Sequence, residues 1–354
     1  MALEEAIKRN PSSAKALYYL GNLYYDKRRY EEAIDCWRRS AELDGGFSIP
    51  WRNLGIAEFN ILHNPEAAAQ MYARAFAADG NDARVLYEWD QLKKRAGLAS
   101  PEERLRMLDA HKKLVAHRDD LTVEYMTLLN QTGQWSAALE QLNARRFSPW
   151  EGGEGLVSGQ YVHAHRALGM KALRAGRAAD ALEHFEAARH YPENLGEGKH
   201  LLTLERDLDY FSGLAAERLG DAGLAQRYWH AASAPLAEAG LHSYFQALAL
   251  EALGDSGAAH AASEGLAEVA RRLMETEPKI DYFATSLPNL LLFDDDLGKR
   301  NRIDALLLSA LASHGLGDAR AAIHQLRRVI DQDPNLLMAS AILDWIELDA
   351  EKAE

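Results

Sequence analysis

A motif that returns after 34 residues constrains the fold of this chain more than any other feature. Its first half places a leucine directly before a glycine, and its second half places an alanine four residues before a large apolar side chain. The clearest copies run Leu17, Leu20, Gly21, Tyr24, Ala33, Trp37 and then Trp51, Leu54, Gly55, Glu58, Ala68, Tyr72. The second half returns at Ala138, Ala181, Ala225 and Ala322, each preceded five residues earlier by a glycine: Gly133, Gly176, Gly220 and Gly317. Gly254 stands at the same distance before Ala259.

This spacing predicts pairs of helices. Apolar or small residues at i, i+3, i+4 and i+7 mark one face of a helix. The glycine of the first helix and the alanine of the second allow the two helices to approach closely, and the glycine between them favours the left-handed conformation that ends a helix. Each pair leaves one apolar face uncovered, so the pairs must stack on their neighbours.

The motif resembles the tetratricopeptide repeat, whose pattern is W-x-x-L-G-x-x-Y, then A-x-x-x-F, then P. Asp333-Pro334-Asn335 supplies the closing proline in the last copy. The resemblance implies an all-α solenoid, a right-handed superhelix of about eight helix hairpins, followed by a C-terminal capping helix over residues 336–350.

We expect a single solenoid over residues 1–354. Regular repeats occupy 12–80, degenerate repeats 81–146, repeats with long connecting loops 147–240, and the last repeats with the cap 241–354. Within the last part, we expect the apolar run 287–293 to belong to the core and Asp294, Asp295 and Asp296 to cap a helix that begins near Leu297.

Composition excludes several classes of function. Lys and Arg number 40 against 53 Asp and Glu, a net charge of −13, which disfavours nucleic acid as a partner. Cys36 is the only cysteine, so one chain holds no disulfide framework. No apolar run reaches the ~20 residues of a membrane helix. We therefore predict a cytoplasmic protein with no membrane partner.

Two inserted segments interrupt the repeat, at residues 145–155 (RRFSPWEGGEG) and 191–199 (YPENLGEGK). Together with the repeats they resemble the C-terminal part of a family of large bacterial proteins. In that family an uncharacterised, β-rich domain related to mutarotase-like folds precedes the repeats. The resemblance implies that a further domain precedes Met1 and that the context is sugar-related, and it carries over no catalytic residue.

The inserted segments are the first candidate binding site. Their side chains combine aromatic rings, carboxylates and an amide: Trp150, Glu151, Glu154, Tyr191, Glu193, Asn194, Glu197 and Lys199. That mixture suits a sugar, and two carboxylates could perform acid–base chemistry on a glycoside. The alternative is structural: the carboxylates cap the next helix, and Trp150 and Tyr191 fill the seam between repeats.

The second candidate is the wall formed by the first helices of the repeats. Tyrosine and arginine, which are enriched at binding hot spots, dominate the column of residues expected there: Tyr18, Arg52, Tyr87, Val123, Arg166, Tyr210 and Tyr244, with Asn22 and Arg84 beside it. The alternative is ordinary packing between adjacent helices. The resemblance adds that some arrays clamp a carboxylate with Lys and Asn. Asn22, Asn53 and Arg84 match, but Tyr18 and Glu88 occupy the other two cation positions, so this clamp is incomplete.

Motifs for other chemistry are missing from the sequence. There is no G-x-S-x-G, no P-loop and no G-x-G-x-x-G. His163 and His165 point about 200° apart on a helix and cannot chelate one metal. We predict no metal and no cofactor. We predict a non-enzymatic interaction scaffold whose concave groove, lined by the first helices, and two inserted segments hold a protein or peptide segment, either from the upstream domain or from a partner in sugar metabolism. The alternative is a carbohydrate-binding or carbohydrate-active protein with its site at the two inserted segments.

Overall fold

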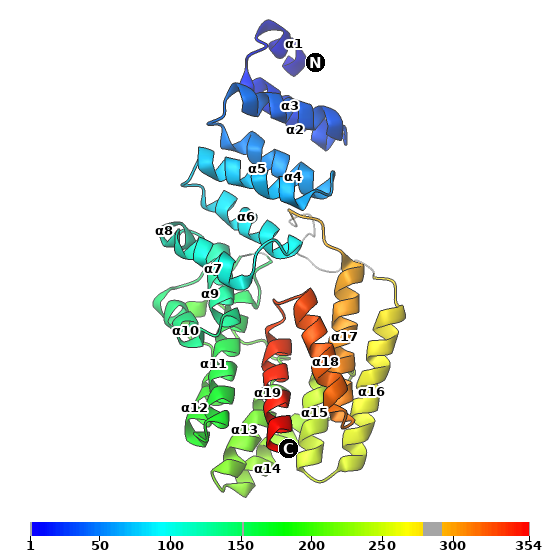
Figure 1. Ribbon diagram of the computed structural model, residues 1–354. Coiled ribbons are helices and arrows are strands. Elements are labelled where there is room, and N and C mark those ends of the chain that lie inside the picture. Colours follow the sequence, from blue (N-terminus) through cyan, green and yellow to red (C-terminus); the bar gives the residue numbers. More distant parts are fainter. Residues whose placement is uncertain (1, 151, 279–291, 354) are drawn as a thin grey trace. The chain divides into compact units, whose positions relative to one another are not determined.

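The computed structural model describes residues 2–150, 152–278 and 292–353, and this part of the chain is all helical (Figure 1). It holds nineteen α-helices and one short 3-10 helix, η1, and has no strand. The helices of the first half are α1 (Ala2–Arg9), α2 (Ala14–Asp26), α3 (Tyr30–Leu43), α4 (Ser48–Asn60), α5 (Pro65–Ala78), α6 (Ala83–Ala96), α7 (Pro101–Asp109), α8 (Lys112–Val115), α9 (Asp119–Gln131) and α10 (Trp135–Ala144). Those of the second half are α11 (Leu156–Arg174), α12 (Ala178–Ala187), η1 (Glu193–Leu195), α13 (Arg206–Arg218), α14 (Ala222–Ser233), α15 (Leu241–Ala252), α16 (Ser256–Glu275), α17 (Leu297–Gly315), α18 (Ala319–Gln332) and α19 (Leu337–Ala353). The predicted α-solenoid of helix hairpins is confirmed.

The chain divides into two compact units. Unit 1 comprises Met1–Tyr125 with Ser286–Asp295, and unit 2 comprises Met126–Thr285 with Asp296–Glu354. In unit 1, α2 pairs with α3 and α4 with α5, and each pair stacks on the next. In unit 2 the pairs are α11/α12, α13/α14, α15/α16 and α17/α18. That all hairpins continue one another as a single solenoid stays a prediction.

The motif glycine marks the place where the two helices of a pair come closest. A Cβ added to Gly55 would lie 2.7 Å from the Tyr72 ring, and one added to Gly169 would lie 2.4 Å from the Phe185 ring. Gly21 stands in the same relation to Trp37, and Gly213 to Trp229. The predicted close approach of the two helices is therefore confirmed in four hairpins, each time against an aromatic ring.

The turn inside each hairpin uses one residue with a positive φ. Five of these residues are the predicted glycines, with φ between 73° and 89°: Gly133, Gly176, Gly220, Gly254 and Gly317. In the first two hairpins the same position holds Arg28, at φ 58°, and His63, at φ 51°. A side chain with a Cβ is strained in this conformation. The turn is thus kept by the hairpin geometry even where the sequence supplies no glycine.

The predicted acidic cap is present through Asp296, which accepts a hydrogen bond from the Lys299 N–H at the start of α17. At the start of α7, Ser100 and Glu103 form a reciprocal capping box. The predicted core run 287–293 lies mostly outside the described residues. Of its described members, Phe293 is buried and packs edge-on against Phe59 and Tyr72.

The last helix does more than cover the preceding hairpin. Besides packing on α18, α19 contacts α11, and its Trp345 ring lies edge-on to Phe211 of α13 at 5.1 Å. In the same unit, Tyr244 of α15 meets His314 of α17, with the hydroxyl and Nδ1 3.0 Å apart. In unit 2, the first helix of each of the hairpins that begin with α11, α13 and α15 is therefore partly covered by the C-terminal helices α17 to α19.

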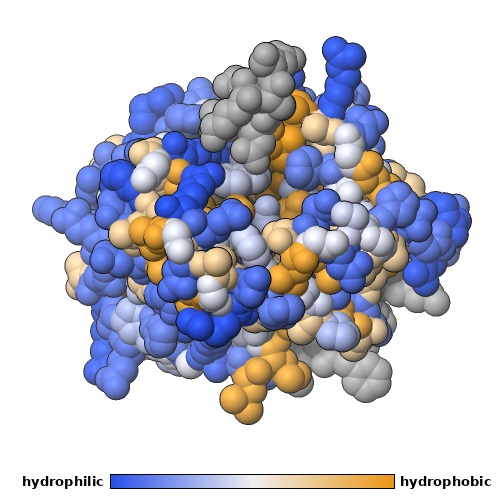
Figure 2. Space-filling view, turned by 90° about the horizontal axis from the view of Figure 1, so that it is seen from below, coloured by the Kyte–Doolittle hydropathy of each residue, from blue (hydrophilic) through white to orange (hydrophobic). Residues whose placement is uncertain are grey.

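Polar side chains predominate on one face of the molecule (Figure 2). Figure 2 shows a face on which hydrophilic residues cover most of the area and apolar ones are scattered among them. The most exposed large apolar residues are Leu201, 98% exposed, and Leu202, 80% exposed, in the segment that joins η1 to α13. No helix in the part of the chain that the structure describes is long and apolar enough to cross a membrane.

Candidate functional site

The two inserted segments are tied to each other by hydrogen bonds. Asn194 donates from Nδ2 to the carbonyl oxygens of Leu142 and Arg145, at 2.8 and 2.7 Å, and its own carbonyl accepts from the Phe147 N–H at 2.8 Å. Gly196 has φ 74°, and a Cβ there would lie 2.5 Å from the Phe147 carbonyl oxygen. Only glycine fits this contact, so the crossing of the two segments is fixed by the backbone.

Glu197 then caps the helix that follows the first segment. Its carboxylate accepts from the Gly155 N–H at 3.2 Å and from the Ser158 hydroxyl at 2.5 Å. Negative charge is favourable at this position because the N-terminus of α11 carries free N–H groups and a partial positive charge. The structural alternative for this carboxylate, helix capping, is the one that the geometry supports.

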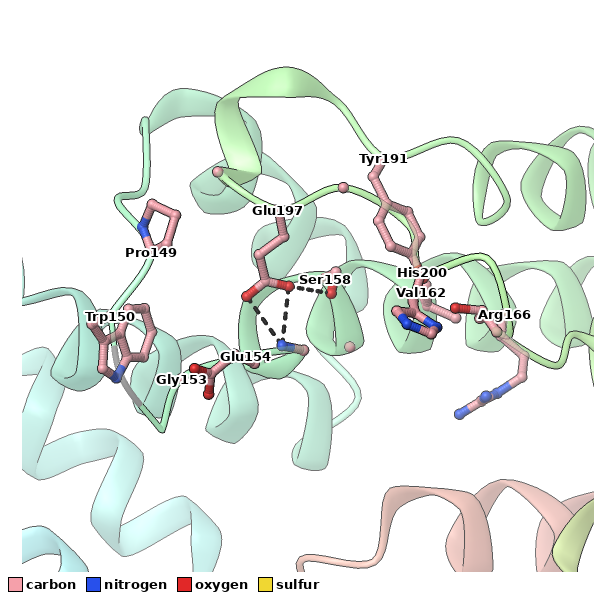
Figure 3. Close-up of a pocket in the computed structure, with 15 residues that line it drawn as sticks. Pro149, Trp150, Gly153, Glu154, Ser158, Val162, Arg166, Tyr191, Glu197 and His200 are labelled. Carbon is pink, nitrogen blue, oxygen red and sulfur yellow. Dashed lines mark hydrogen bonds between the residues drawn. The ribbon is translucent and has the colours of Figure 1, made fainter. Parts of the chain in front are cut away.

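A cavity of about 890 Å³ opens between the two segments and the first turns of α11 (Figure 3). Trp150, Pro149 and Glu154 lie at one end, Tyr191, His200 and Arg166 lie at the other, and Glu197 stands between them. The remaining wall consists of small or apolar residues: Gly153, Gly155, Ser158, Gly159, Val162, Gly196, Gly198 and Thr203. Aromatic walls with a few polar groups are typical of ligand sites.

Arg166 is the positive group of the cavity wall. It is only 7% exposed, its Nη1 donates to the Asp207 carboxylate at 2.9 Å, and its Nη2 lies 3.0 Å from the ring Nδ1 of His163. Burial holds the pKa of His163 well below its usual value, and the guanidinium of Arg166 lowers it further. The Nε of Arg166 has no hydrogen-bond partner among the described residues.

Acidic side chains lie near Tyr191 at this end of the cavity, and two of them are paired with cations: Asp207 with Arg166 and Glu205 with Lys199. Burial raises the pKa of Tyr191, and the carboxylates of Glu205, Glu197 and Asp207 raise it further.

The predicted loop residues thus divide into three groups. Trp150, Glu154, Tyr191 and Glu197 line the cavity. Asn194 fixes the loops, and Lys199 pairs with Glu205 at 2.5 Å. Glu193 is exposed at the start of η1, and Glu151 lies outside the described residues. Their role in binding stays a prediction.

In unit 1 the predicted wall residues join adjacent repeats. Asn22 accepts from Nδ2 of Asn53 at 3.0 Å and from the Trp37 indole at 2.9 Å. Arg52 donates to both oxygens of the buried Glu88 carboxylate, at 2.5 and 2.6 Å.

Glu88 also accepts from Arg84 at 2.8 Å and from the Tyr72 hydroxyl at 3.1 Å. Asn22 and Asn53 are therefore bonded to each other, and Arg52 and Arg84 both pair with Glu88 of the same chain. Half-buried Tyr18 and Tyr87, together with the Arg84 side chain, 60% exposed, remain accessible on this wall.

In unit 2 the predicted wall is less open. Arg166 is buried against Asp207, Tyr244 is 2% exposed, and half-buried Tyr210 packs against Phe211. The cause is the C-terminal helices, whose side chains share one core cluster with Phe211 and Tyr244. Binding by these three residues stays a prediction.

A buried charge network in unit 1 was not predicted. Arg104 donates to both oxygens of Asp90, at 3.0 and 2.7 Å, and to Glu124 at 2.5 Å, while Lys94 reaches Glu124 at 3.0 Å. Although burial alone would raise it, the pKa of Glu124 lies at about 2 because Lys94 and Arg104 stabilise the carboxylate. Charged residues at helical spacing read as a solvated face, so the sequence offered no signal for this network.

The two histidines of α11, His163 and His165, contact different partners. Nδ1 of His165 lies 3.1 Å from Nδ1 of His184, and His163 faces Arg166, so the two histidines of α11 serve different contacts. Across the described ranges no three metal-ligating side chains gather at one point.

The comparisons with known proteins concern the repeat. Residues 14–47 match the tetratricopeptide repeat model. Similar solved structures include YrrB, a TPR protein with an unusual peptide-binding site, at 17% identity over 64% of this chain and 97% of that one, with a TM-score of 0.39. A tetratricopeptide repeat protein from Parabacteroides merdae is 11% identical over 85% of this chain and 98% of its own, with a TM-score of 0.42.

A third similar structure is that of Naa15/Naa10 bound to HypK-THB, 13% identical over 99% of this chain and 63% of that one, with a TM-score of 0.43. At such identities and scores these likenesses support nothing about what this chain binds. Residues 14–47 are a tetratricopeptide repeat, and the chain around them is an α-solenoid of helix hairpins.

Proposed function

We propose that the chain is a non-enzymatic protein-interaction scaffold and that the cavity between the inserted segments holds a segment of its protein partner. The observation that carries the proposal is a preformed cavity whose walls are fixed by Asn194, Gly196 and Glu197. A site that is ordered before binding loses little conformational entropy when a partner enters. Loops held by a rigid helical scaffold are a common place for such sites.

The state of Glu197 argues for binding rather than for glycoside chemistry. Acid–base catalysis on a glycoside needs two carboxylates that act on the substrate. Both oxygens of Glu197 already accept hydrogen bonds at the start of α11. Glu197 is therefore not available as the second carboxylate that would act on a glycoside together with Glu154. The carbohydrate alternative stays a prediction, and quenching of Trp150 fluorescence by sugars would favour it.

The wall of unit 1 offers a second contact surface in this proposal. Tyr18, Tyr87 and Arg84 keep part of their surface open, while Glu88 and Asn22 hold the helices beneath them. Tyrosine and arginine are enriched among the residues that contribute most to binding energy at protein interfaces. The occupant in this proposal is a segment of the protein partner.

Site-specific photo-crosslinking tests the proposal. A benzophenone amino acid replaces His200, an exposed residue of the cavity wall, and in a second protein it replaces Glu217, an exposed residue of α13. We expect a partner that is captured from position 200 but not from position 217, and whose capture is lost when Trp150 is changed to Ala. Capture of the same proteins from both positions, with no effect of Trp150→Ala, would contradict the proposal.

A further inference from the structure

Glu154 is an available carboxylate in the cavity wall. Its side chain is exposed, lies beside Trp150, and has no hydrogen-bond or ion-pair partner among the described residues (Figure 3). Glu197 adds a second negative charge, because its partners are a neutral N–H and a neutral hydroxyl. The helix dipole offsets this charge only in part.

The single cation of the wall does not cancel these charges. The guanidinium of Arg166 donates to Asp207 at 2.9 Å, so this pair is neutral as a whole. The remaining charge of the lining side chains, on Glu154 and Glu197, is negative. A cationic group is therefore the complementary ligand for the end of the cavity that holds Glu154.

Trp150 narrows the choice of cation. Its ring lies against Gly153, where an added Cβ would stand 2.1 Å from the ring. The absence of a side chain at Gly153 therefore leaves the space that the indole occupies. Tryptophan is the best aromatic partner for a cation, and the planar guanidinium of arginine both stacks on a ring and donates in pairs to a carboxylate. Lysine has a compact, strongly hydrated charge and suits this combination less well.

An independent observation at the other end of the cavity points to a hydrogen-bond acceptor on the ligand. Arg166 is 7% exposed, and its Nε is a buried donor without an acceptor in the described part of the protein. A buried donor without an acceptor lowers the stability of the protein, so a ligand that supplies the acceptor gains from it. A peptide backbone carries a carbonyl at every residue, and one that reaches Arg166 would supply the acceptor that its Nε lacks.

We propose that the cavity takes an arginine of an extended peptide segment, with the guanidinium between Glu154 and Trp150 and a backbone carbonyl of the segment at Arg166. This inference rests on the proposed function, since it names the chemistry of the segment that the cavity holds. It accounts for both the unpaired carboxylate and the unpaired buried donor with one ligand.

The test uses the full chain and the blocked tripeptide Ac-Gly-Arg-Gly-NH2. Its comparison peptide carries citrulline, which has the shape of arginine without the charge. The indole N–H signal of Trp150 in a two-dimensional NMR spectrum, assigned with Trp150→Phe, reports binding. We expect a saturable shift with the arginine peptide, and an affinity about tenfold lower both for the citrulline peptide and for Glu154→Gln. Glu217→Gln, an exposed carboxylate on α13, should bind as the wild type does.

The outcomes separate this inference from the proposed function. Equal binding of the arginine and citrulline peptides would overturn the inference and leave a segment-binding cavity in place. Equal binding of a lysine peptide would overturn the choice of arginine. A shift of the Trp150 signal with a monosaccharide but with none of the peptides, together with no crosslinking from position 200, would contradict both this inference and the proposed function.

Discussion

Replacing either of two glycines of one helix by alanine should change the stability of unit 2, in opposite directions. Gly169 and Gly159 both belong to α11, ten residues apart. A Cβ at Gly169 would stand 2.4 Å from Phe185, whereas a Cβ at Gly159 would meet nothing within 4 Å. We therefore expect Gly169→Ala to destabilise unit 2 and Gly159→Ala to stabilise it.

The magnitudes follow from two effects. Replacing a helical glycine by alanine gains up to about 1 kcal/mol through backbone propensity. At position 169 the new methyl group must displace Phe185, which is fully buried and stacks on Phe211 with ring centroids 5.9 Å apart. Overpacking of this kind costs about 1–3 kcal/mol. The net expectation is a loss of about 1–2 kcal/mol for Gly169→Ala and a gain of about 0.5–1 kcal/mol for Gly159→Ala.

Thermal unfolding followed by circular dichroism measures the difference. For a unit of this size, each kcal/mol shifts the Tm by about 2–4 °C. Gly169→Ala should lower the Tm by about 2–8 °C, and Gly159→Ala should raise it by about 1–4 °C. An equal rise in both variants would refute the close contact at Gly169 and, with it, the pairing of α11 with α12.

Three further predictions concern other parts of the chain. Arg104→Met should lower the free energy of unfolding of unit 1, measured by urea titration, by about 3–5 kcal/mol, because the buried Asp90 loses a bidentate partner. The control Arg106→Met, at an exposed position of the same helix, should change it by less than about 0.5 kcal/mol. His63→Gly should raise the Tm, since it removes about 1–2 kcal/mol of left-handed strain; a lower Tm would refute this. Burial, together with the neighbouring His184, lowers the pKa of His165 to about 4, whereas the unfolded value is about 6.5. The folded state therefore favours the neutral ring, and the stability that this gives above pH 6.5 is lost as the pH falls towards 4. His165→Gln should flatten that part of the plot of Tm against pH, and an unchanged slope would contradict the assignment.

The sequence was most informative where one residue type has one geometric use. Glycine five residues before the motif alanine predicted the left-handed turns, and all five of these glycines adopt a positive φ. The motif glycine predicted the close approach of the helices, and the rings of Tyr72 and Phe185 lie against it. Backbone requirements of this kind are local, so a single sequence can reveal them.

Side chains with several uses were harder to predict. Arg52 and Arg166 resemble hot-spot residues in sequence, yet each pairs with a buried carboxylate of the same chain, Glu88 or Asp207. The partner of each lies in a different helix, and no local pattern identifies it. The packing of α19 against α11, and of Trp345 against Phe211, likewise depends on how distant hairpins meet.

The two candidate surfaces differ in what a partner could gain from them. On the wall of unit 1, Arg52 and Asn22 already have internal partners, so a ligand that contacts them must first replace bonds that the protein has made. In the cavity, Glu154 is exposed and has no partner among the described residues, and Arg166, besides its bond to Asp207, has a buried Nε that lacks an acceptor in the same part of the chain. Removing such a defect adds to the affinity, whereas exchanging one good bond for another adds little. For that reason Glu154 and Trp150, rather than the tyrosine and arginine column, are the residues at which a change should first alter partner binding.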